Sequence, residues 1–211
     1  MEGDNYIALI GDVVRSREVT DRGGLQERLR GGIIEVNEQF KSKIAASFVL
    51  TIGDEFQGLL WRAEGLDRLL AHIRSFTHPV ELRFGLGIGG LETELRQIAL
   101  GMDGPCFHRA RDAIERAEAM HTYVEVDVGA DDNAFAIYAL LYSASRRDWT
   151  ERQRQVLDLA MAGLSGKAIA SQLGVTPSAV SQHLQATEAD AILAATSYWL
   201  DALTAAQAFM E

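Results

Sequence analysis

The chain has very little cysteine, because Cys106 is the only one among its 211 residues. A single thiol excludes an internal disulfide and any metal site built from several thiolates. Long apolar runs are also missing, since none approaches the roughly 18 residues that a membrane span requires. The N-terminal residues 1–5 are acidic and lead straight into a strand-like segment. We therefore expect a cytoplasmic protein with no membrane partner.

Basic residues are scarce relative to acidic ones. The chain carries 20 Lys and Arg against 30 Asp and Glu, which gives a net charge of −10 and an isoelectric point near 5.0. Non-specific affinity for nucleic acids comes mainly from phosphate neutralisation by Lys and Arg, so this balance argues against a general polyanion binder. Any contact with DNA must therefore be local.

The length and the 47% apolar content allow one ordinary hydrophobic core and a small second one. The hydrophobic period changes near Trp149, where short helical stripes replace the alternation of strands and helices. We predict two domains, a palm-like α+β domain at residues 1–145 and a helical domain at residues 146–211.

The first domain alternates strand-like and helix-like segments in the order β-α-β-β-α-β-α-β. Thr20 can cap the first helix, and Gly53-Asp54-Glu55 has the spacing of a hairpin turn. The expected strands are residues 6–12, 47–52, 56–61, 80–89 and 122–128, and the expected helices are residues 20–40, 66–73 and 107–119. This order predicts an α+β fold of the ferredoxin-like or palm type, with helices on one face of a mainly antiparallel sheet.

The tripeptide Ile-Gly-Asp occurs twice, each time at the C-terminal end of a strand-like apolar run. It places Asp12 and Asp54, the latter followed by Glu55, at a sheet edge where the backbone is closely approachable. Such carboxylates suit a hard, oxygen-liganded ion such as Mg²⁺ or Mn²⁺, usually with substrate phosphates as further ligands. Alternatively, the aspartates are ordinary turn residues, and Glu55 is either a third ligand or a solvated neighbour.

A basic segment follows the turn Asp103-Gly104-Pro105. His108, Arg109 and Arg111 fall in the first turns of a helix, where the helix dipole disfavours positive charge, and a bound phosphate would relieve this conflict. These three residues are the candidates for stabilising phosphate charge in catalysis. The alternative is that the arginines pair with nearby acids. The residues expected to bind a nucleotide are Gly11, Gly53, Gln57, Gly104, Arg109 and Arg111.

The second domain carries helix-capping signals at short intervals. Thr150 begins a capping box, Ser165 can cap a short second helix, and Thr176 starts a third helix after a tight glycine turn. A short helix, a glycine-containing turn and a second capped helix indicate a helix-turn-helix. We expect DNA to bind through residues 165–185.

Polar side chains of the third helix are left outward once Val180 and Leu184 are buried, and Gln and Ser can read base edges. The residues expected to contact DNA are Lys167, Thr176, Ser178, Ser181, Gln182 and Gln185. This part of the chain has few Lys and Arg residues to contact phosphates, so useful affinity for DNA would need a homodimer that supplies a second half-site. The alternative is a three-helix module that binds a protein partner. The last helix, about residues 188–209, is expected in the core or at a dimer interface.

Four phrases of the chain resemble the SatD family of bacterial proteins. They are YIALIGD (6–12), GDEFQGLL (53–60), RFGLGIG (83–89) and DGPCFHRAR (103–111). The resemblance covers nearly the whole chain, and it implies a cytoplasmic protein in two parts.

More distantly, the first 128 residues resemble the palm-type domain of class III nucleotidyl cyclases and GGDEF diguanylate cyclases. This resemblance implies that Asp12 and Asp54 bind the metal. The chain departs from these patterns at three places. Ile52 stands at the first GGDEF glycine, His108 stands at the cyclase asparagine, and Arg111 falls one residue early for the cyclase arginine.

Residues 166–184 are similar to the helix-turn-helix of sigma-factor region four and of LuxR-type regulators. We therefore expect a transcriptional regulator in which a palm-like domain binds a metal and a nucleotide, or a similar phosphorylated ligand, while a helix-turn-helix binds DNA. The alternative is an enzyme, a Mg- or Mn-dependent nucleotidyl cyclase or transferase that uses the same residues. A third interpretation is a non-catalytic scaffold with a protein-binding helical module.

Overall fold

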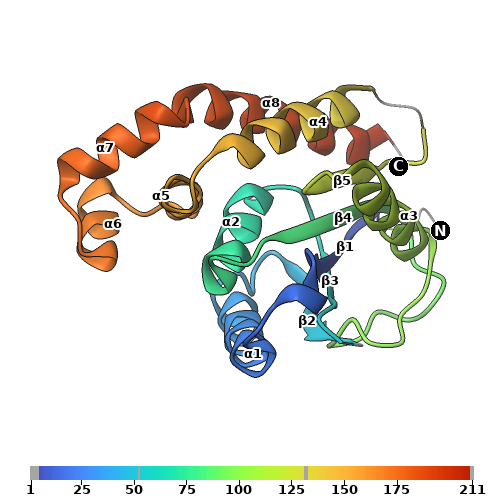
Figure 1. The fold of residues 1–211 in the computed structure, drawn as a ribbon. Helices are drawn as coiled ribbons and strands as arrows, with labels where there is room; N and C mark the ends of the chain where they lie inside the picture. Colours follow the sequence, from blue (N-terminus) through green and yellow to red (C-terminus); the bar gives the residue numbers. More distant parts are fainter. Residues whose placement is uncertain (1–4, 52, 131–132, 210–211) are drawn as a thin grey trace.

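Figure 1 shows the fold as a computed structural model, which describes residues 5–51, 53–130 and 133–209. Five strands form one sheet in the order β2-β3-β1-β4-β5, and only the pair β4–β5 is parallel among these described residues. The strands are β1 (Tyr6–Val13), β2 (Ile44–Leu50), β3 (Phe56–Leu60), β4 (Leu82–Gly89) and β5 (Val124–Asp127).

Helices account for most of the remaining chain. They are α1 (Arg22–Gln39), α2 (Leu66–Thr77), α3 (Pro105–Met120), α4 (Asn133–Asp148), α5 (Glu151–Met161), α6 (Gly166–Leu173), α7 (Pro177–Ala186) and α8 (Ala189–Phe209), with a 3₁₀ turn at Ser16–Glu18. Within the described ranges, no helix is both long enough and apolar enough to span a membrane.

The predicted α+β class and the mainly antiparallel sheet are confirmed. The elements β1, α1, β2, β3, α2 and β4 follow one another as the sequence predicts, and the order β2-β3-β1-β4 is that of a ferredoxin-like sheet. The second strand was expected to reach Ile52, which lies outside the described residues. β1 lies between β3 and β4, so its exit is flanked by two other strands.

Helices cover both faces of the sheet, so the prediction of helices on one face is wrong. α1 and α2 cover the face that carries Leu9, whereas α3 covers the face that carries Ile10. The glycines of β4 allow α3 to cover this second face. A Cβ at Gly85 or Gly87 would meet the backbone of α3. Without those side chains, α3 lies directly against the strand.

The helix caps follow local chemistry closely. Asp21, rather than the expected Thr20, caps α1, because its Oδ1 accepts a hydrogen bond from the Gly24 N–H at 2.9 Å. A carboxylate at this position is also stabilised by the positive end of the helix dipole. The caps of α5, α6 and α7 are confirmed as Thr150, Ser165 and Thr176.

Helix α4 is an element for which the sequence analysis made no prediction. Residues 134–145 carry no charge, so no polar face marks the helical period. In Figure 1, α4 lies beside α8. Tyr138 of α4 stacks on Trp199 of α8, with ring centroids 5.3 Å apart. The two helices therefore pack together through aromatic side chains.

One core connects the sheet with the C-terminal helices. Trp149, Leu157 and Trp199 belong to the same buried cluster as the residues of β1, β4, α1 and α2. A smaller cluster that includes Ile169 and Val180 holds α5, α6 and α7 together. The C-terminal helices thus have a small core of their own and also share the main one.

A buried ion network crosses the predicted boundary between residues 145 and 146. Arg146 of α4 donates to Asp158 of α5 at 2.9 and 2.6 Å, and its Nε donates to Glu81 at 2.8 Å. His78 contacts the same Asp158 carboxylate at 3.0 Å. Burial opposes ionisation, but the charge of Arg146 and these hydrogen bonds hold the pKa of Asp158 well below its ordinary value. The boundary stays a prediction, and this network ties its two sides together.

Candidate metal and nucleotide site

Two predicted metal ligands, Asp12 and Glu55, lie level with each other at one end of the sheet. Gly11 of β1 pairs with Phe56 of β3, so the next position along the antiparallel ladder puts Asp12 opposite Glu55. The Thr51 N–H donates to the Glu55 carbonyl at 2.8 Å and closes the turn between β2 and β3. The exit of β1 and the β2–β3 turn therefore meet at one edge.

Asp54 lies at the same edge but faces the other side. Its residue is 7% exposed, and its carboxylate accepts hydrogen bonds from Arg22 and Gln26 of α1, each at 3.4 Å. Because side chains alternate along β1, Asp12 shares the α3 face with Ile10. The structure thus brings Asp12 and Asp54 to one end of the sheet on different faces, and their sharing of one cation stays a prediction.

Glu55 is held by Arg111 of α3. The two Arg111 Nη atoms donate to the two carboxylate oxygens at 2.5 and 2.8 Å, and the Thr51 hydroxyl donates at 3.1 Å. The Arg111 hydrogen bonds outweigh partial burial and lower the pKa of Glu55. A predicted metal ligand and a predicted phosphate-binding arginine are therefore partners. The side chains of Arg111 and Glu55 are 42% and 23% exposed, so a ligand can reach them.

Asp12 has an unfavourable environment for its charge. Burial raises the pKa of Asp12, while Arg83 and the Val13 N–H act in the opposite direction. The negative charges of Glu118 and Glu55 add to the rise. Arg83 also forms an ion pair with Glu118 at 2.9 Å. A partly buried carboxylate with a raised pKa beside a second carboxylate is frequent at functional sites.

The predicted phosphate-binding residues at the start of α3 lie toward the opposite end of the sheet. β4 puts Arg83 beside Asp12, whereas Gly89 pairs with the start of β1 and lies against the first turn of α3. The strand rises by about 3.3 Å per residue, so these two ends are about 20 Å apart. Gly104 lies at that far end, against Gly90 and Leu91, whereas Arg109, with His108 just before it, lies level with Gly87, about 13 Å along β4 from Arg83.

The basic side chains near the start of α3 have partners within the fold. His108 contacts Asp103 at 2.8 Å, and both side chains are largely exposed. Arg109 donates to the Ile88 carbonyl. Arg111 pairs with an acid, but that acid is Glu55, 56 positions away in the sequence, so the alternative pairing with nearby acids stays a prediction. Of the three catalytic candidates, the structure brings only Arg111 to the acids.

The remaining predicted nucleotide-binding residues have roles in the fold or in the turn. Gln57 Nε2 donates to the Ala99 carbonyl at 2.5 Å. Gly11 lies under the Phe56 ring, where a Cβ would overlap the aromatic carbons. Gly53 has a φ of +70°, a left-handed conformation that favours glycine in a tight turn. A ligand contact for these three residues stays a prediction.

The carboxylate oxygens of Asp12, Asp54 and Glu55 are the kind of ligand that Mg²⁺ and Mn²⁺ prefer, since both ions bind hard oxygen donors. Among the described residues, no three His, Cys, Asp or Glu side chains are grouped in a way that could hold a metal ion. Mg²⁺ is commonly held by one or two carboxylates together with phosphate oxygens. Asp12, with Glu55 or Asp54, would be the protein's share of such a site.

Three residues at this edge were not predicted from the sequence, namely Arg22, Gln26 and Arg83. Arg22 stands in the first turn of α1, where positive charge is as unfavourable for the helix dipole as it is in α3. Arg83 stands on the small face of β4. Both signals were present in the sequence, but neither says which acid each arginine meets.

The predicted DNA-contacting residues lie on α6, on α7 and in the turn between them, and all are exposed. Thr176 Oγ1 accepts a hydrogen bond from the Ala179 N–H at 3.1 Å, and the Ser181 hydroxyl donates to the Pro177 carbonyl at 3.1 Å. These two hydroxyl groups therefore form hydrogen bonds with the backbone of α7. The full exposed set is Lys167, Thr176, Ser178, Ser181, Gln182 and Gln185.

The strand order, together with helices on both faces of the sheet, defines an α+β protein with a ferredoxin-like sheet. The sequence model of the SatD family matches residues 6–197, and the chain belongs to this family. No protein of curated function matches the chain.

Two solved structures are similar to the chain at low identity. One is that of a bacterial light-regulated adenylyl cyclase, with 13% identity and a TM-score of 0.45 over 59% of this chain and 76% of that chain. The other is the catalytic core of a rhodopsin-guanylyl cyclase with converted specificity in complex with ATPαS, with 17% identity and a TM-score of 0.40 over 54% of this chain and 72% of that chain.

Proposed function

We propose that the edge formed by Asp12, Glu55 and Arg111 binds a nucleoside triphosphate together with Mg²⁺ or Mn²⁺. The observation that carries this proposal is the position of a partly buried acid, Asp12, beside a solvent-accessible ion pair between Glu55 and Arg111. Carboxylate oxygens suit the cation, and a guanidinium suits the phosphate, so one edge offers both kinds of partner.

Binding of a metal would relieve the unfavourable environment of the Asp12 carboxylate. A cation next to Asp12 favours its ionised form and offsets the cost of burial. Arg111 can exchange its bond to Glu55 for a bond to a phosphate oxygen, because a planar guanidinium fits either group with two parallel hydrogen bonds. Glu55 would then be free to face the cation.

The chemistry that we infer for this edge is that of a nucleotidyl cyclase or nucleotidyl transferase in the cytoplasm. The cation, when bound, neutralises phosphate charge and polarises the reacting phosphoryl group. Arg111 holds the phosphates and stabilises the negative charge that develops on them. We assign no part to His108 and Arg109, because their side chains contact Asp103 and the Ile88 carbonyl instead. A regulator that binds the nucleotide without turnover would use the same contacts.

A thermal-shift screen tests the binding, because a ligand bound only by the folded chain raises the melting temperature. We expect at least one of the four ribonucleoside triphosphates to raise it with Mn²⁺ and not without. Asp12→Asn should remove this response, and Asp190→Asn on the exposed side of α8 is the matched control that should keep it. An equal response from Asp12→Asn would contradict the site. Mass spectrometry of the same mixtures for pyrophosphate and a cyclic or linked nucleotide separates turnover from binding.

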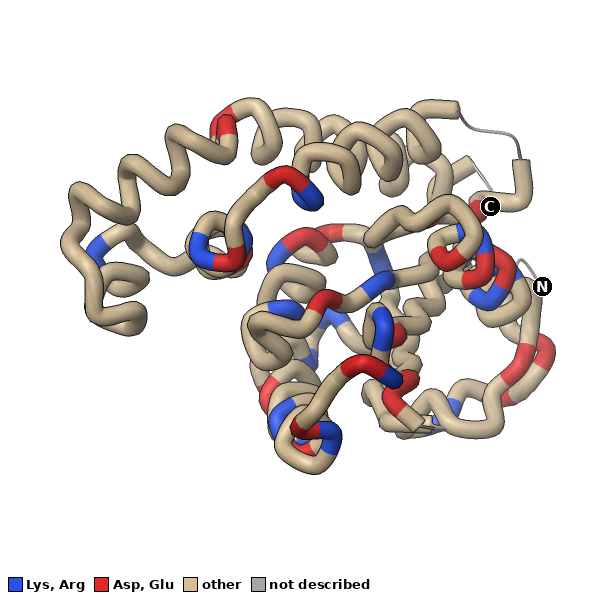
Figure 2. Tube along the Cα trace, in the orientation of Figure 1, with Lys and Arg blue, Asp and Glu red and all other residues tan. Residues whose placement is uncertain are grey.

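A second candidate function is local DNA binding by α6 and α7, which would make the chain a transcriptional regulator. The observation that favours it is the exposed polar face of α7, which includes Ser178, Gln182 and Gln185 and follows a three-residue turn after α6. Figure 2 shows no Lys, Arg, Asp or Glu along α7. This helix would therefore supply base-edge contacts and sequence preference, while Lys167 of α6 would supply a charged contact to phosphate.

Two substitutions separate base reading from phosphate binding. Gln182→Ala should weaken binding to a selected DNA site by roughly 1–3 kcal/mol and relax its sequence preference. Lys167→Ala should weaken binding to all sequences alike and reduce the salt slope by about one counterion. Fluorescence anisotropy over a range of salt concentrations measures both effects. Failure to enrich any sequence from a genomic library at low salt would leave α5–α7 as a module for a protein partner.

A further inference from the structure

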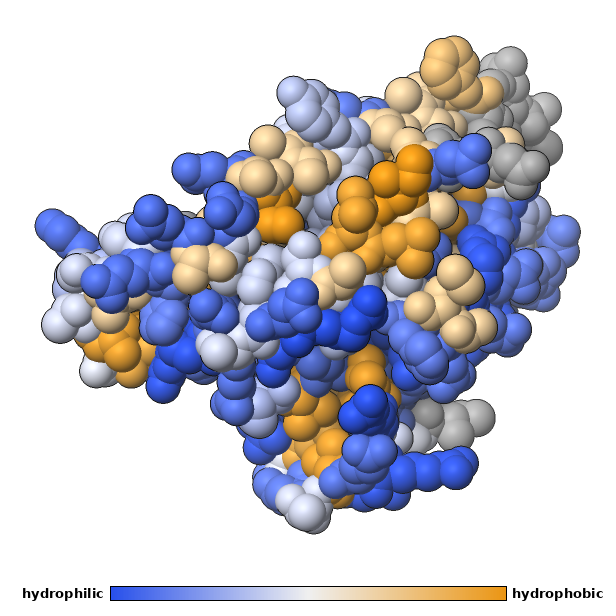
Figure 3. Space-filling view, turned by 45° about the horizontal axis from the view of Figure 1, so that its top comes forward, coloured by the Kyte–Doolittle hydropathy of each residue, from blue (hydrophilic) through white to orange (hydrophobic). Residues whose placement is uncertain are grey.

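Helices α4 and α8 together expose a large apolar surface. Four of its side chains reach far into solvent: Ile137, Leu140 and Leu141 of α4 are 55%, 44% and 65% exposed, and Tyr198 of α8 is 76% exposed. Figure 3 shows hydrophobic residues gathered in a patch on the face turned toward the viewer. We refer to these four side chains, with the hollow beside them, as the α4–α8 face.

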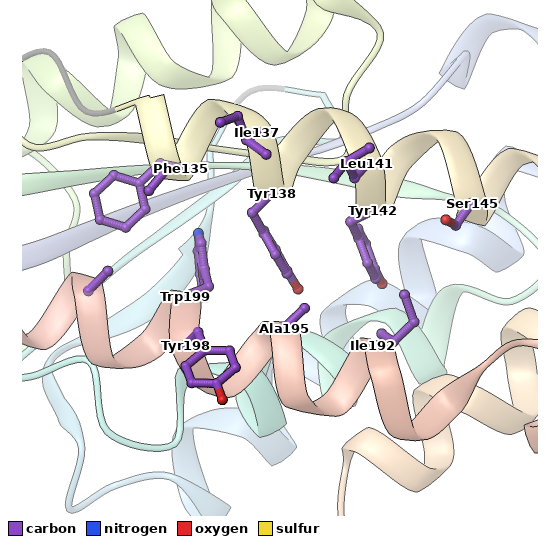
Figure 4. Close-up of a pocket in the computed structure, with 12 residues that line it drawn as sticks. Phe135, Ile137, Tyr138, Leu141, Tyr142, Ser145, Ile192, Ala195, Tyr198 and Trp199 are labelled. Atoms are coloured by element: carbon purple, nitrogen blue, oxygen red, sulfur yellow. The ribbon is translucent and has the colours of Figure 1, made fainter.

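A hollow of about 420 Å³ lies between the two helices within this face. Its floor is formed by the stacked rings of Tyr138, Tyr142 and Trp199, and its rim includes Leu141 and Tyr198. Figure 4 shows the three rings side by side between the helices. The face therefore combines a hollow with protruding apolar side chains at its edge.

The α4–α8 face carries no charge near its centre. Residues 134–145 and 191–200 contain no Lys, Arg, Asp or Glu. Within these two stretches, the exposed positions are alanine or large apolar residues, apart from Ser197. A surface helix of a monomer normally carries charged or polar residues on its outer side, and a helix that is apolar all round is normally buried. This chain leaves both outer sides uncovered by any other described segment.

We propose that the α4–α8 face binds the same face of a second copy of this chain. The exposed parts of the four protruding side chains amount to on the order of 300 Å² of apolar surface. A standard interface takes roughly 800 Å² from each partner, and a little over half of that area is apolar. Four side chains thus supply about two thirds of the apolar area that a stable dimer needs, and the neighbouring alanines add to it.

The shape of the face favours a symmetric pair over another occupant. In a twofold dimer the same surface meets itself, so it must offer both a projection and a hollow. Tyr198 and Leu141 are the projections, and each can enter the hollow of the partner copy. Two α4–α8 pairs would then form a four-helix arrangement with the aromatic rings inside. The net charge of −10 does not oppose the contact locally, because the acids lie outside the face.

Sedimentation-velocity centrifugation of the full chain over a range of concentrations tests the dimer. We expect a concentration-dependent dimer, and we expect Leu141→Glu to raise its dissociation constant by more than about tenfold, because a charge would be buried at the centre of the interface. Ile34→Glu is the matched control, since Ile34 is a 57% exposed aliphatic residue on α1. It should leave the dissociation constant unchanged.

Cross-linking gives an independent measurement that does not rest on a destabilising charge. Cys106 is buried, and burial raises the pKa of its thiol to about 12, so it does not react. A Leu141→Cys variant treated with a short bis-maleimide should give a covalent dimer, and Ile34→Cys should not. A chain that stays monomeric at every concentration overturns the proposal. So does a dimer that Leu141→Glu leaves intact, or a monomer that native mass spectrometry finds carrying a small apolar molecule.

Discussion

The substitution Asp158→Asn removes the carboxylate that Arg146 meets inside the protein. The Asp158 side chain is 0% exposed and that of Arg146 is 1% exposed. The replacement keeps the shape of the side chain and deletes its charge. Arg146 is then left buried with Glu81 as its remaining acidic partner in the network. The variant therefore measures how strongly α5 is tied to α4 and to the segment before β4.

The expected loss of stability is about 3 kcal/mol. Breaking a buried ion pair by removing one partner costs roughly 3–5 kcal/mol. Glu81 still faces Arg146 at 2.8 Å and has a 14% exposed side chain, so the lower end of that range applies. At about 2–4 °C per kcal/mol for a chain of this size, the melting temperature should fall by roughly 6–12 °C.

The pH dependence follows from the lowered pKa of Asp158. A carboxyl whose folded pKa lies below its ordinary value of 3.8 stabilises the fold above that value, and this stabilisation is lost as the pH falls through the folded pKa. The stability curves of the wild type and of Asp158→Asn should therefore stay apart at neutral pH and converge in acid.

Urea unfolding followed by tryptophan fluorescence gives the free energy of unfolding. Glu64→Gln is the control, because it breaks an exposed ion pair with Lys43 and should leave the midpoint unchanged. Replacing both partners, Arg146→Met with Asp158→Leu, should recover most of the loss, since neither member of the buried pair is left without its partner and Arg154 still pairs with Glu81 at 2.8 Å. A change of less than about 1 kcal/mol in Asp158→Asn would refute the reasoning.

Two further substitutions test the fold and the site. Gly87→Ala should reduce the free energy of unfolding by roughly 1–3 kcal/mol, because its Cβ would meet the backbone of α3, whereas Gly90→Ala has open space and should change little. Asp12→Asn without metal should melt at the same or a higher temperature than the wild type at neutral pH. Burial raises the pKa of Asp12, so its ionised form destabilises the fold, and this penalty disappears as the pH falls toward 3.8. A lower melting temperature at neutral pH, measured by calorimetry, would contradict that assignment.

Much of the local structure could be predicted from the sequence. The caps Thr150, Ser165 and Thr176 were predictable, because a capping side chain bonds an N–H only two or three residues away. The strand order along the chain followed from hydrophobic periods that extend over 5 to 12 residues. The repeated Ile-Gly-Asp phrase likewise placed Asp12 and Asp54 at strand ends. Helix α4 was not predicted, since a helix without a polar face shows no hydrophobic period in the sequence.

Only the tertiary structure decided which of these residues meet. The small face of β4 was visible in the sequence, but the sequence does not say that α3 returns to cover it. That return puts Arg111 on Glu55, 56 positions away along the chain, and leaves His108 in contact with Asp103. Periodicity and capping are effects of neighbouring residues, whereas the pairing of distant charges depends on where the packed chain returns. The sequence by itself therefore determined most of the elements, though not α4, and the acids at strand ends, while packing determined the partners of those acids.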